Sequence, residues 1–289
     1  DYVRSSGLLQ LASAAKYLLA PAAAGFLMPL VGVRGLVLLD ASTCLVTVGC
    51  TMTVRRALAA GASQRAAAQP GDDHDVLAGW RTITASPGLR TLVALMTLAT
   101  LAIGVIQVLI KPILLPTVTT SEMGVIETIA ATGMLVGAAL VTAWKSAQPT
   151  TLLAAGLAGT GAAMVLVPLG PGAWWVTACG FLTFGSLPLS QAGAEVLVRT
   201  QVDNTRQART WGTISMVTQL GYLAAYLCSG VLVDRVLQPL LEPGQRLSAS
   251  LGAVVGIGPG RGAALLVGIM GLVMAMVALG VRLQRQRLA

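Results

Sequence analysis

Long runs of apolar residues with no charge among them constrain this chain more than any other feature. About 20 helical residues span a bilayer, because each residue rises ~1.5 Å and the hydrocarbon is ~30 Å thick. The stretches Leu92–Ile110 and Ala263–Val281 both approach this length without a single charged residue. Every backbone polar group must be satisfied inside lipid, which favours helices for runs of this length. The sequence therefore predicts an all-α, polytopic membrane protein.

Composition agrees with this fold class and excludes others. Of 289 residues, 55% are hydrophobic and 10% charged, and the mean hydropathy is +0.78. A soluble domain carries about 25% charged residues, so an ordinary globular enzyme is excluded. Disordered chains are rich in charge and poor in apolar residues, which excludes disorder as well.

Eight segments are predicted to cross the membrane as helices. They are Leu8–Leu30, Leu36–Val54, Leu92–Ile110, Met123–Trp144, Leu152–Leu169, Trp174–Val198, Thr213–Val233 and Ala263–Val281.

The longest polar loop divides these spans two against six. Residues 55–75 are small, polar and interrupted by Pro and Gly, which is typical of a flexible linker. An amphipathic stretch follows, capped by Asp75 and ended by Pro87, and we expect it to lie in the cytoplasmic interface. Its apolar face carries Val76, Leu77, Trp80 and Ile83. The predicted organisation is two helices in residues 1–54, a linker with an interfacial helix in 55–88, and six helices in 89–289.

Lysine and arginine gather in alternate loops. One set of loops holds thirteen of them and the opposite set holds five, and with Lys16 inside a span they make up all 19. The more basic side is expected to be cytoplasmic, which places both ends of this chain there. The net charge of +8 is thereby explained by topology, and no nucleic-acid partner is expected.

Two spans carry polar or small residues at helical spacing. On one the stripe is Thr97, Thr100, Gly104, Gln107 and Lys111; on the other it is Ser215, Gln219, Tyr222, Tyr226 and Ser229. Each set lies on one helical face. Two interpretations stay open, a water-accessible substrate cavity or hydrogen bonds that hold helices together.

Charged residues inside spans are costly and therefore informative. Glu127 follows a capping-box pattern, Thr119–Glu122, and a carboxyl in apolar surroundings is a candidate proton carrier. The alternative is a shallow position wetted from outside. Asp40 is a second proton-coupling candidate, or a structural hydrogen-bonding group. Lys16 either faces the cavity or extends its ammonium back to the cytoplasmic surface.

Basic and acidic groups also cluster at one predicted helix end. Glu195 and Arg199 form an i, i+4 pair, which is a solvated pair or, with Arg209, a latch of a cytoplasmic gate. Trp144, Trp174 and Trp175 mark the membrane interfaces.

No catalytic or cofactor-binding pattern emerges. The single histidine, His74, lies in a polar loop, and the four cysteines fall in apolar runs without CxxC spacing. The segment Gly256–Gly262 lacks the third glycine of a dinucleotide fingerprint, and no Walker A sequence occurs. We therefore expect no enzyme activity, no cofactor and no metal. The expected partners are the lipid bilayer, a small amphipathic substrate and protons, and a monomer is expected.

Several segments resemble the major facilitator superfamily, in particular its macrolide-efflux-like branch of drug/proton antiporters. Ser6–Met28 is similar to the fifth helix of that branch, with Pro21 and Gly25 present and Ala20 in place of a glycine. Leu36–Val48 resembles the sixth helix, with Asp40 at the matching aspartate. Three later segments resemble the interfacial helix, the junction of helices ten and eleven with Arg209, and the loop into helix twelve: Gly79–Leu95, Val198–Val236 and Gly256–Leu266.

The resemblance implies that the chain holds helices five to twelve of a twelve-helix fold. Residues 1–54 are then the last two helices of the N-terminal half-bundle. It further implies export of amphipathic small molecules or drugs by proton antiport, with alternating access between the half-bundles. The alternatives are a dedicated exporter of one metabolite, such as a siderophore or antibiotic, and a non-transporting membrane scaffold or sensor. Arginine outnumbers lysine 16 to 3 and alanine is abundant, which favours a GC-rich bacterial genome. The expected location is therefore a bacterial cytoplasmic membrane.

Overall fold

The computed structural model is almost entirely helical in the part of the chain that it describes. It describes residues 27, 30–56, 78–144, 147–170, 172–203, 206–241, 252, 255–256 and 258–283, and no strand occurs among them. The all-α prediction is confirmed. The predicted first span and the linker fall almost entirely outside these residues.

Six helices of the described part are long and apolar enough to cross a membrane. They are Leu30–Arg56, α3 (Pro87–Leu114), α4 (Thr120–Ala143), α5 (Pro149–Leu166) with the 3₁₀ turn η1 (Val167–Leu169), α7 (Gln207–Leu232) with the π turn η2 (Val233–Leu237) and α8 (Gln238–Leu240), and α10 (Arg261–Leu283). Helix α6 (Ala173–Gln201), which contains the predicted span Trp174–Val198, has 29 residues but does not belong to this set. The chain is therefore an all-α protein with the transmembrane helices of a membrane protein.

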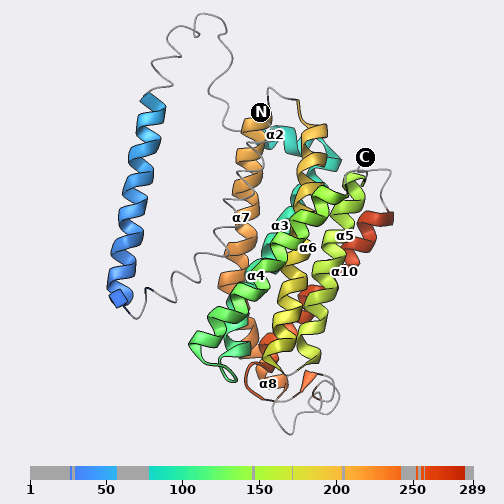
Figure 1. The fold of residues 1–289 in the computed structure, drawn as a ribbon. Coiled ribbons are helices and arrows are strands. Elements are labelled where there is room, and N and C mark those ends of the chain that lie inside the picture. The colour runs from blue at the N-terminus through green and yellow to red at the C-terminus, as the bar shows by residue number, and fades with distance from the viewer. Residues whose placement is uncertain are drawn as a thin grey trace, which may run out of the picture. The chain divides into compact units, whose positions relative to one another are not determined.

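The described helices belong to two units. The helix Leu30–Arg56 is one, and the helices from α2 (Ala78–Ala85) to α10 form the other. In the larger unit α6 packs between α4 and α5, α5 packs on α10, and α3 packs on α7 and α10 (Figure 1).

Local sequence explains where several of these helices begin. Ser86 caps α3 by accepting a hydrogen bond from the Leu89 amide, and Pro87 occupies the first turn, where a missing N–H costs nothing. The predicted capping box of α4 is confirmed. Thr119 accepts from the Glu122 amide at 3.3 Å, and the Glu122 carboxylate accepts from the Thr119 amide at 2.8 Å.

Glycines let the helices of the larger unit approach closely. A Cβ at Gly137 of α4 would collide with the Gly185 carbonyl of α6 and lie 3.1 Å from Pro188 Cδ. A Cβ at Gly161 of α5 would lie 2.8 Å from the Gly271 carbonyl of α10. Packing of this kind, with small residues at the contact, is usual between membrane helices.

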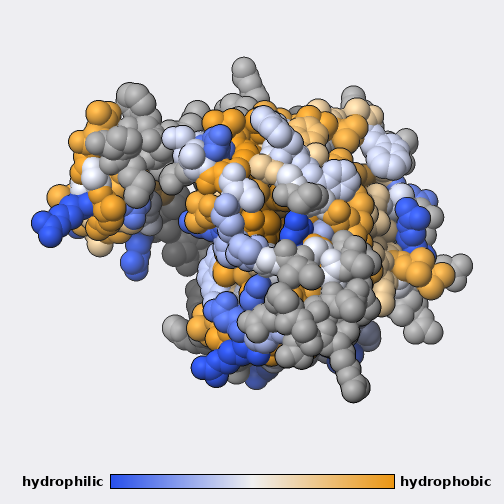
Figure 2. Space-filling model, turned by 90° about the horizontal axis from the view of Figure 1, so that it is seen from below, coloured by the Kyte–Doolittle hydropathy of each residue, from blue (hydrophilic) through white to orange (hydrophobic). Residues whose placement is uncertain are grey.

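Apolar stripes remain on the outside of the larger unit. On α7 the stripe is Met216, Leu220, Leu223 and Leu227, and on α10 it is Leu272, Met276, Leu279 and Leu283. All are at least half exposed, and Figure 2 shows hydrophobic side chains gathered on the outer surface. Contiguous apolar surface is costly in water, whereas lipid accommodates it, so these stripes agree with a membrane-embedded bundle.

Two residues of the predicted apolar face, Trp80 and Ile83, lie within α2, and Ile83 packs on the bundle. Ile83 is 3% exposed and belongs to the core, whereas Trp80 is 49% exposed. A Cβ at Gly79 would lie 2.8 Å from the Arg209 carbonyl of α7, so this glycine lets α2 approach that helix.

Candidate functional site: a cavity between four helices

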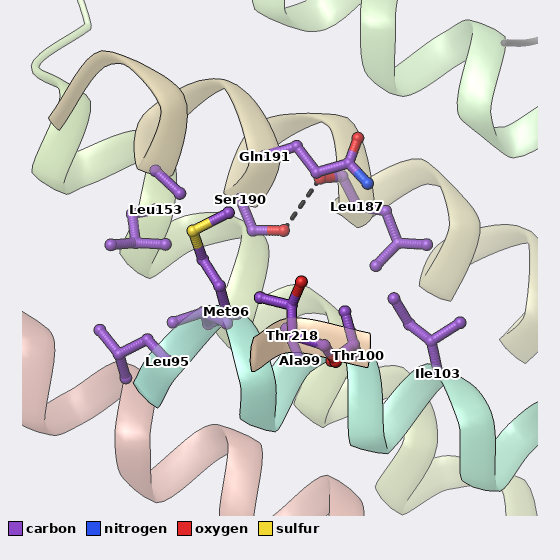
Figure 3. A pocket seen from close by; sticks show the side chains of 12 residues that line it. Leu95, Met96, Ala99, Thr100, Ile103, Leu153, Leu187, Ser190, Gln191 and Thr218 are labelled. Carbon is purple, nitrogen blue, oxygen red and sulfur yellow. Dashed lines mark hydrogen bonds between the residues drawn. The ribbon is translucent and has the colours of Figure 1, made fainter. Parts of the chain in front are cut away.

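A cavity of about 130 Å³ lies between α3, α5, α6 and α7. Its apolar wall consists of Leu95, Met96, Ala99, Ile103, Leu153, Leu157, Leu187 and Ala194. Figure 3 shows Met96 and Ile103 of α3 directed toward α6, with Ser190 opposite Met96 and Leu187 opposite Ile103. An engineered cavity of ~150 Å³ lined by apolar residues holds benzene, so this space suits a group about the size of one ring.

Four polar residues complete the wall, and in three of them the hydroxyl already donates a hydrogen bond to a backbone carbonyl. Thr100 donates to the Thr218 carbonyl at 2.7 Å, Ser190 to the Leu187 carbonyl at 2.9 Å, and Thr218 to the Ser215 carbonyl at 3.0 Å. These hydroxyls can therefore still accept hydrogen bonds, but they have no proton left to donate.

Gln191 is the fourth polar residue. Its side chain makes no hydrogen bond to any residue that the structure describes, and it is exposed although it lines the cavity. In Figure 3 its amide turns away from the side chains of α3. Gln191 thus lies where the cavity opens and offers both a donor and an acceptor there.

No charged side chain belongs to the lining of this cavity as the structure describes it. A buried charge without a partner is unfavourable by several kcal/mol. The wall therefore suits the uncharged, apolar part of a ligand.

The two predicted polar stripes face each other across the contact of α3 and α7. Tyr226 donates to Gln107 Oε1 at 2.8 Å, and Thr100 bridges to the carbonyl of Thr218. A Cβ at Gly104 would lie 2.7 Å from Ala225 Cβ, so the backbones approach closely. Thr100 belongs to both features, since it holds the two helices together and lines the cavity.

The other predicted cavity residues lie beside this contact. Thr97 donates a hydrogen bond within its own helix, to the Val93 carbonyl. The ring of Tyr222 lies tilted against that of Tyr226, with 6.0 Å between the ring centroids. Ser215 and Gln219 are exposed on α7. None of these four lines the cavity, and Lys16 lies outside the described residues.

The predicted proton-coupling residues do not line the cavity. Glu127 is half-buried on α4, and its carboxylate has no hydrogen bond or ion pair to any described residue. Asp40 is exposed on the helix Leu30–Arg56, in the other unit.

The predicted gate residues gather where α6 ends and α7 begins. Glu195 and Arg199 are both exposed and form no ion pair with each other in the described structure. The Gln207 side chain donates to the Val202 carbonyl at 3.3 Å and so ties the two helices at this turn. Arg209 is exposed in the first turn of α7, and its carbonyl accepts from Thr213.

A second cavity, of about 250 Å³, lies at the beginning of α4 and α6. It is lined by Val118, Ser121, Glu122, Val125, Ile126, Ala173 and Trp174. The carboxylate of Glu122 already accepts a hydrogen bond in the capping box. Trp174 is 73% exposed, so this cavity opens at the end of the bundle. The smaller cavity, enclosed by four helices, is the stronger candidate site.

Sequence reasoning missed the wall that α6 contributes. Ser190 and Gln191 follow Pro188 and line the cavity, yet α6 carries polar residues on several faces and shows no stripe. A proline inside an otherwise helical segment, followed by adjacent polar residues, was the available signal. Among the described residues, no group of three His, Cys, Asp or Glu side chains could hold a metal ion.

Comparison with protein families, with curated proteins and with solved structures finds no match for this chain.

Proposed function

We propose that the chain belongs to a secondary active transporter that exports amphipathic small molecules across a bacterial cytoplasmic membrane. The observation that carries this proposal is the cavity between α3, α5, α6 and α7. It lies within a bundle of membrane-type helices, it has an apolar wall, and its few polar groups include one free amide. Ligand sites in helical bundles have this composition.

Helix α6 contains a proline, which would allow the wall of the cavity that it forms to move. Pro188 lies inside α6, next to Leu187 of the cavity wall, and has no N–H to hydrogen-bond within the helix. Helices bend at such prolines, and a bend in α6 would change the width of the cavity. This agrees with alternating access to a site near the middle of the membrane.

The resemblance of the sequence to the major facilitator superfamily supports the same proposal. The six helices α3 to α7 and α10, with α6 counted as a span, would correspond to one half-bundle. The predicted span Leu8–Leu30 and the helix Leu30–Arg56 would belong to the other half, which gives eight spans.

The distribution of basic residues supports an orientation with both ends of this chain in the cytoplasm. In the larger unit, six described arginines lie at the end of the bundle that holds α2: Arg81, Arg90, Arg199, Arg206, Arg209 and Arg282. The opposite end holds three described basic residues, Lys111, Arg235 and Arg261. The more basic end is the cytoplasmic one in most membrane proteins.

Proton antiport would drive the export, with Glu127 as the proton carrier. Glu127 is half-buried and unpaired within the described residues, on a helix that does not contribute to the cavity. Proton and substrate would therefore bind at separate places and be coupled through movement of the helices.

The test is an accumulation assay in a bacterium that lacks its major efflux pumps. The complete reading frame is expressed, and uptake of the uncharged drug chloramphenicol and of the uncharged dye N-phenyl-1-naphthylamine is followed with and without a protonophore. Lower accumulation that the protonophore abolishes is expected. Unchanged accumulation of both compounds would contradict broad export and favour a dedicated metabolite exporter or a non-transporting module.

A further inference from the structure

The chemistry of the cavity wall narrows the class of ligand. Eight of its twelve residues are apolar and none is charged, and the hydroxyl protons of Thr100, Ser190 and Thr218 are all used by backbone carbonyls. A cation would find no carboxylate here, and an anion would find no basic group.

The only hydrogen-bond donor left to a ligand in this wall, within the described structure, is the side-chain amide of Gln191. It lies at the opening of the cavity, while the interior holds about 130 Å³ of mostly apolar space. A ligand that uses both features places a ring-sized apolar group inside and a hydrogen-bond acceptor at the opening.

Resting on the transport function proposed above, we propose that this cavity selects uncharged molecules. The group it takes is about the size of one ring and carries a carbonyl or similar acceptor that Gln191 binds. Amphipathic cations and carboxylates are excluded because the wall has no countercharge for them.

Three compounds of the same shape test the proposed class of ligand. Benzamide is uncharged and carries a carbonyl, benzamidinium is a cation, and benzoate is an anion. Binding to the purified full chain in detergent is measured by saturation-transfer NMR. Benzamide is expected to bind at least about tenfold more tightly than either charged compound, since its neutral amide can exchange hydrogen bonds with Gln191, whereas a charged group beside the apolar wall loses hydration and gains no countercharge.

Two substitutions in α3 test whether benzamide binds in this cavity. Ala99→Phe fills the space from α3 and should abolish benzamide binding, whereas Ala94→Phe, at an exposed position of the same helix, should not. Thermal unfolding checks that both variants are folded, and Ala99→Leu replaces Ala99→Phe if the larger side chain prevents folding.

Gln191→Glu is a nearly isosteric change that supplies the missing countercharge. It should raise benzamidinium affinity about tenfold, because hydrogen bonds to charged groups are stronger than neutral ones. Gln148→Glu, at the exposed N-cap of α5 and outside the cavity, is the matched control and should change nothing. Equal binding of benzamide and benzamidinium to the unaltered chain, or no binding of any of the three, would overturn the proposal.

An export assay distinguishes the proposed ligand class from the proposed transport function. Export of chloramphenicol, which is uncharged and carries an amide carbonyl, is compared with export of the cationic dye trimethylammonium-diphenylhexatriene. Protonophore-sensitive export of both compounds would uphold transport and overturn the ligand class. Selective benzamide binding without export of either compound would uphold the ligand class and refute transport.

Discussion

Tyr226 of α7 donates a hydrogen bond to Gln107 of α3, with 2.8 Å between the phenolic oxygen and Oε1. The two residues are 119 positions apart in the sequence, and both lie on polar stripes that the spacing of residues predicted. The bond joins the helices that supply two walls of the cavity, so its strength bears on the stability of the site.

Tyr226→Phe should destabilise the bundle by about 0.6 kcal/mol, the average for hydrogen bonds between membrane helices. Tyr226 is 52% exposed, so no larger effect is expected. The measurement is reversible unfolding of the chain in mixed micelles. A double-mutant cycle with Gln107→Leu isolates the interaction, and a coupling energy near zero would show that the bond does not form in the membrane protein.

The same helices also approach closely at Gly221. A Cβ there would meet the Thr97 carbonyl and the Thr100 hydroxyl, and would lie 2.9 Å from the Leu101 amide. Gly221→Ala should therefore push α3 and α7 apart and lower the free energy of unfolding by about 1–3 kcal/mol, as overpacking usually does.

Gly212 of the same helix provides the matched control. A Cβ at Gly212 has no atom within 4 Å, and alanine is the better helix former by about 0.5–1 kcal/mol. Gly212→Ala should leave stability unchanged or raise it. Equal effects of the two substitutions would contradict the close approach of α3 and α7 at Gly221.

Local sequence patterns predicted the elements of the fold well. The capping box at Thr119 and the end of the amphipathic helix before Pro87 are confirmed because each depends on neighbours within three or four residues. The apolar runs of α3, α4, α5, α7 and α10 were predicted because hydrocarbon thickness fixes their length.

The site was harder to predict because its wall resembles any buried helix contact. Ile103 and Leu187 line the cavity, but apolar residues such as these serve equally in helix packing or against lipid. Only the tertiary arrangement shows which apolar face borders empty space. The polar stripes identified the right helices, yet most of their members lie at the contact of α3 and α7 and only Thr100 reaches the cavity.

The capping box of α4 gives a prediction that is independent of the cavity. Thr119→Ala removes the acceptor of the Glu122 amide and should cost about 1 kcal/mol, the usual value for an N-cap. Hydrogen exchange should quicken at the amides of Glu122 and Met123, in the first turn of α4. Ser121→Ala, one residue before Glu122 and exposed, should leave exchange unchanged, and equal protection in both variants would contradict the role of Thr119.

Glu127 gives the prediction that separates proton coupling from substrate binding. Because its carboxylate lies on α4 and does not line the cavity, Glu127→Gln should leave benzamide binding by the purified chain unchanged. The same substitution should abolish protonophore-sensitive export of N-phenyl-1-naphthylamine, since the neutral amide cannot release a proton. Asp234→Asn, at an exposed position of η2, is the control for loss of a carboxylate elsewhere in the bundle. Export by Glu127→Gln at the rate of the unaltered protein would exclude Glu127 as the proton carrier and leave Asp40 as the candidate to test next.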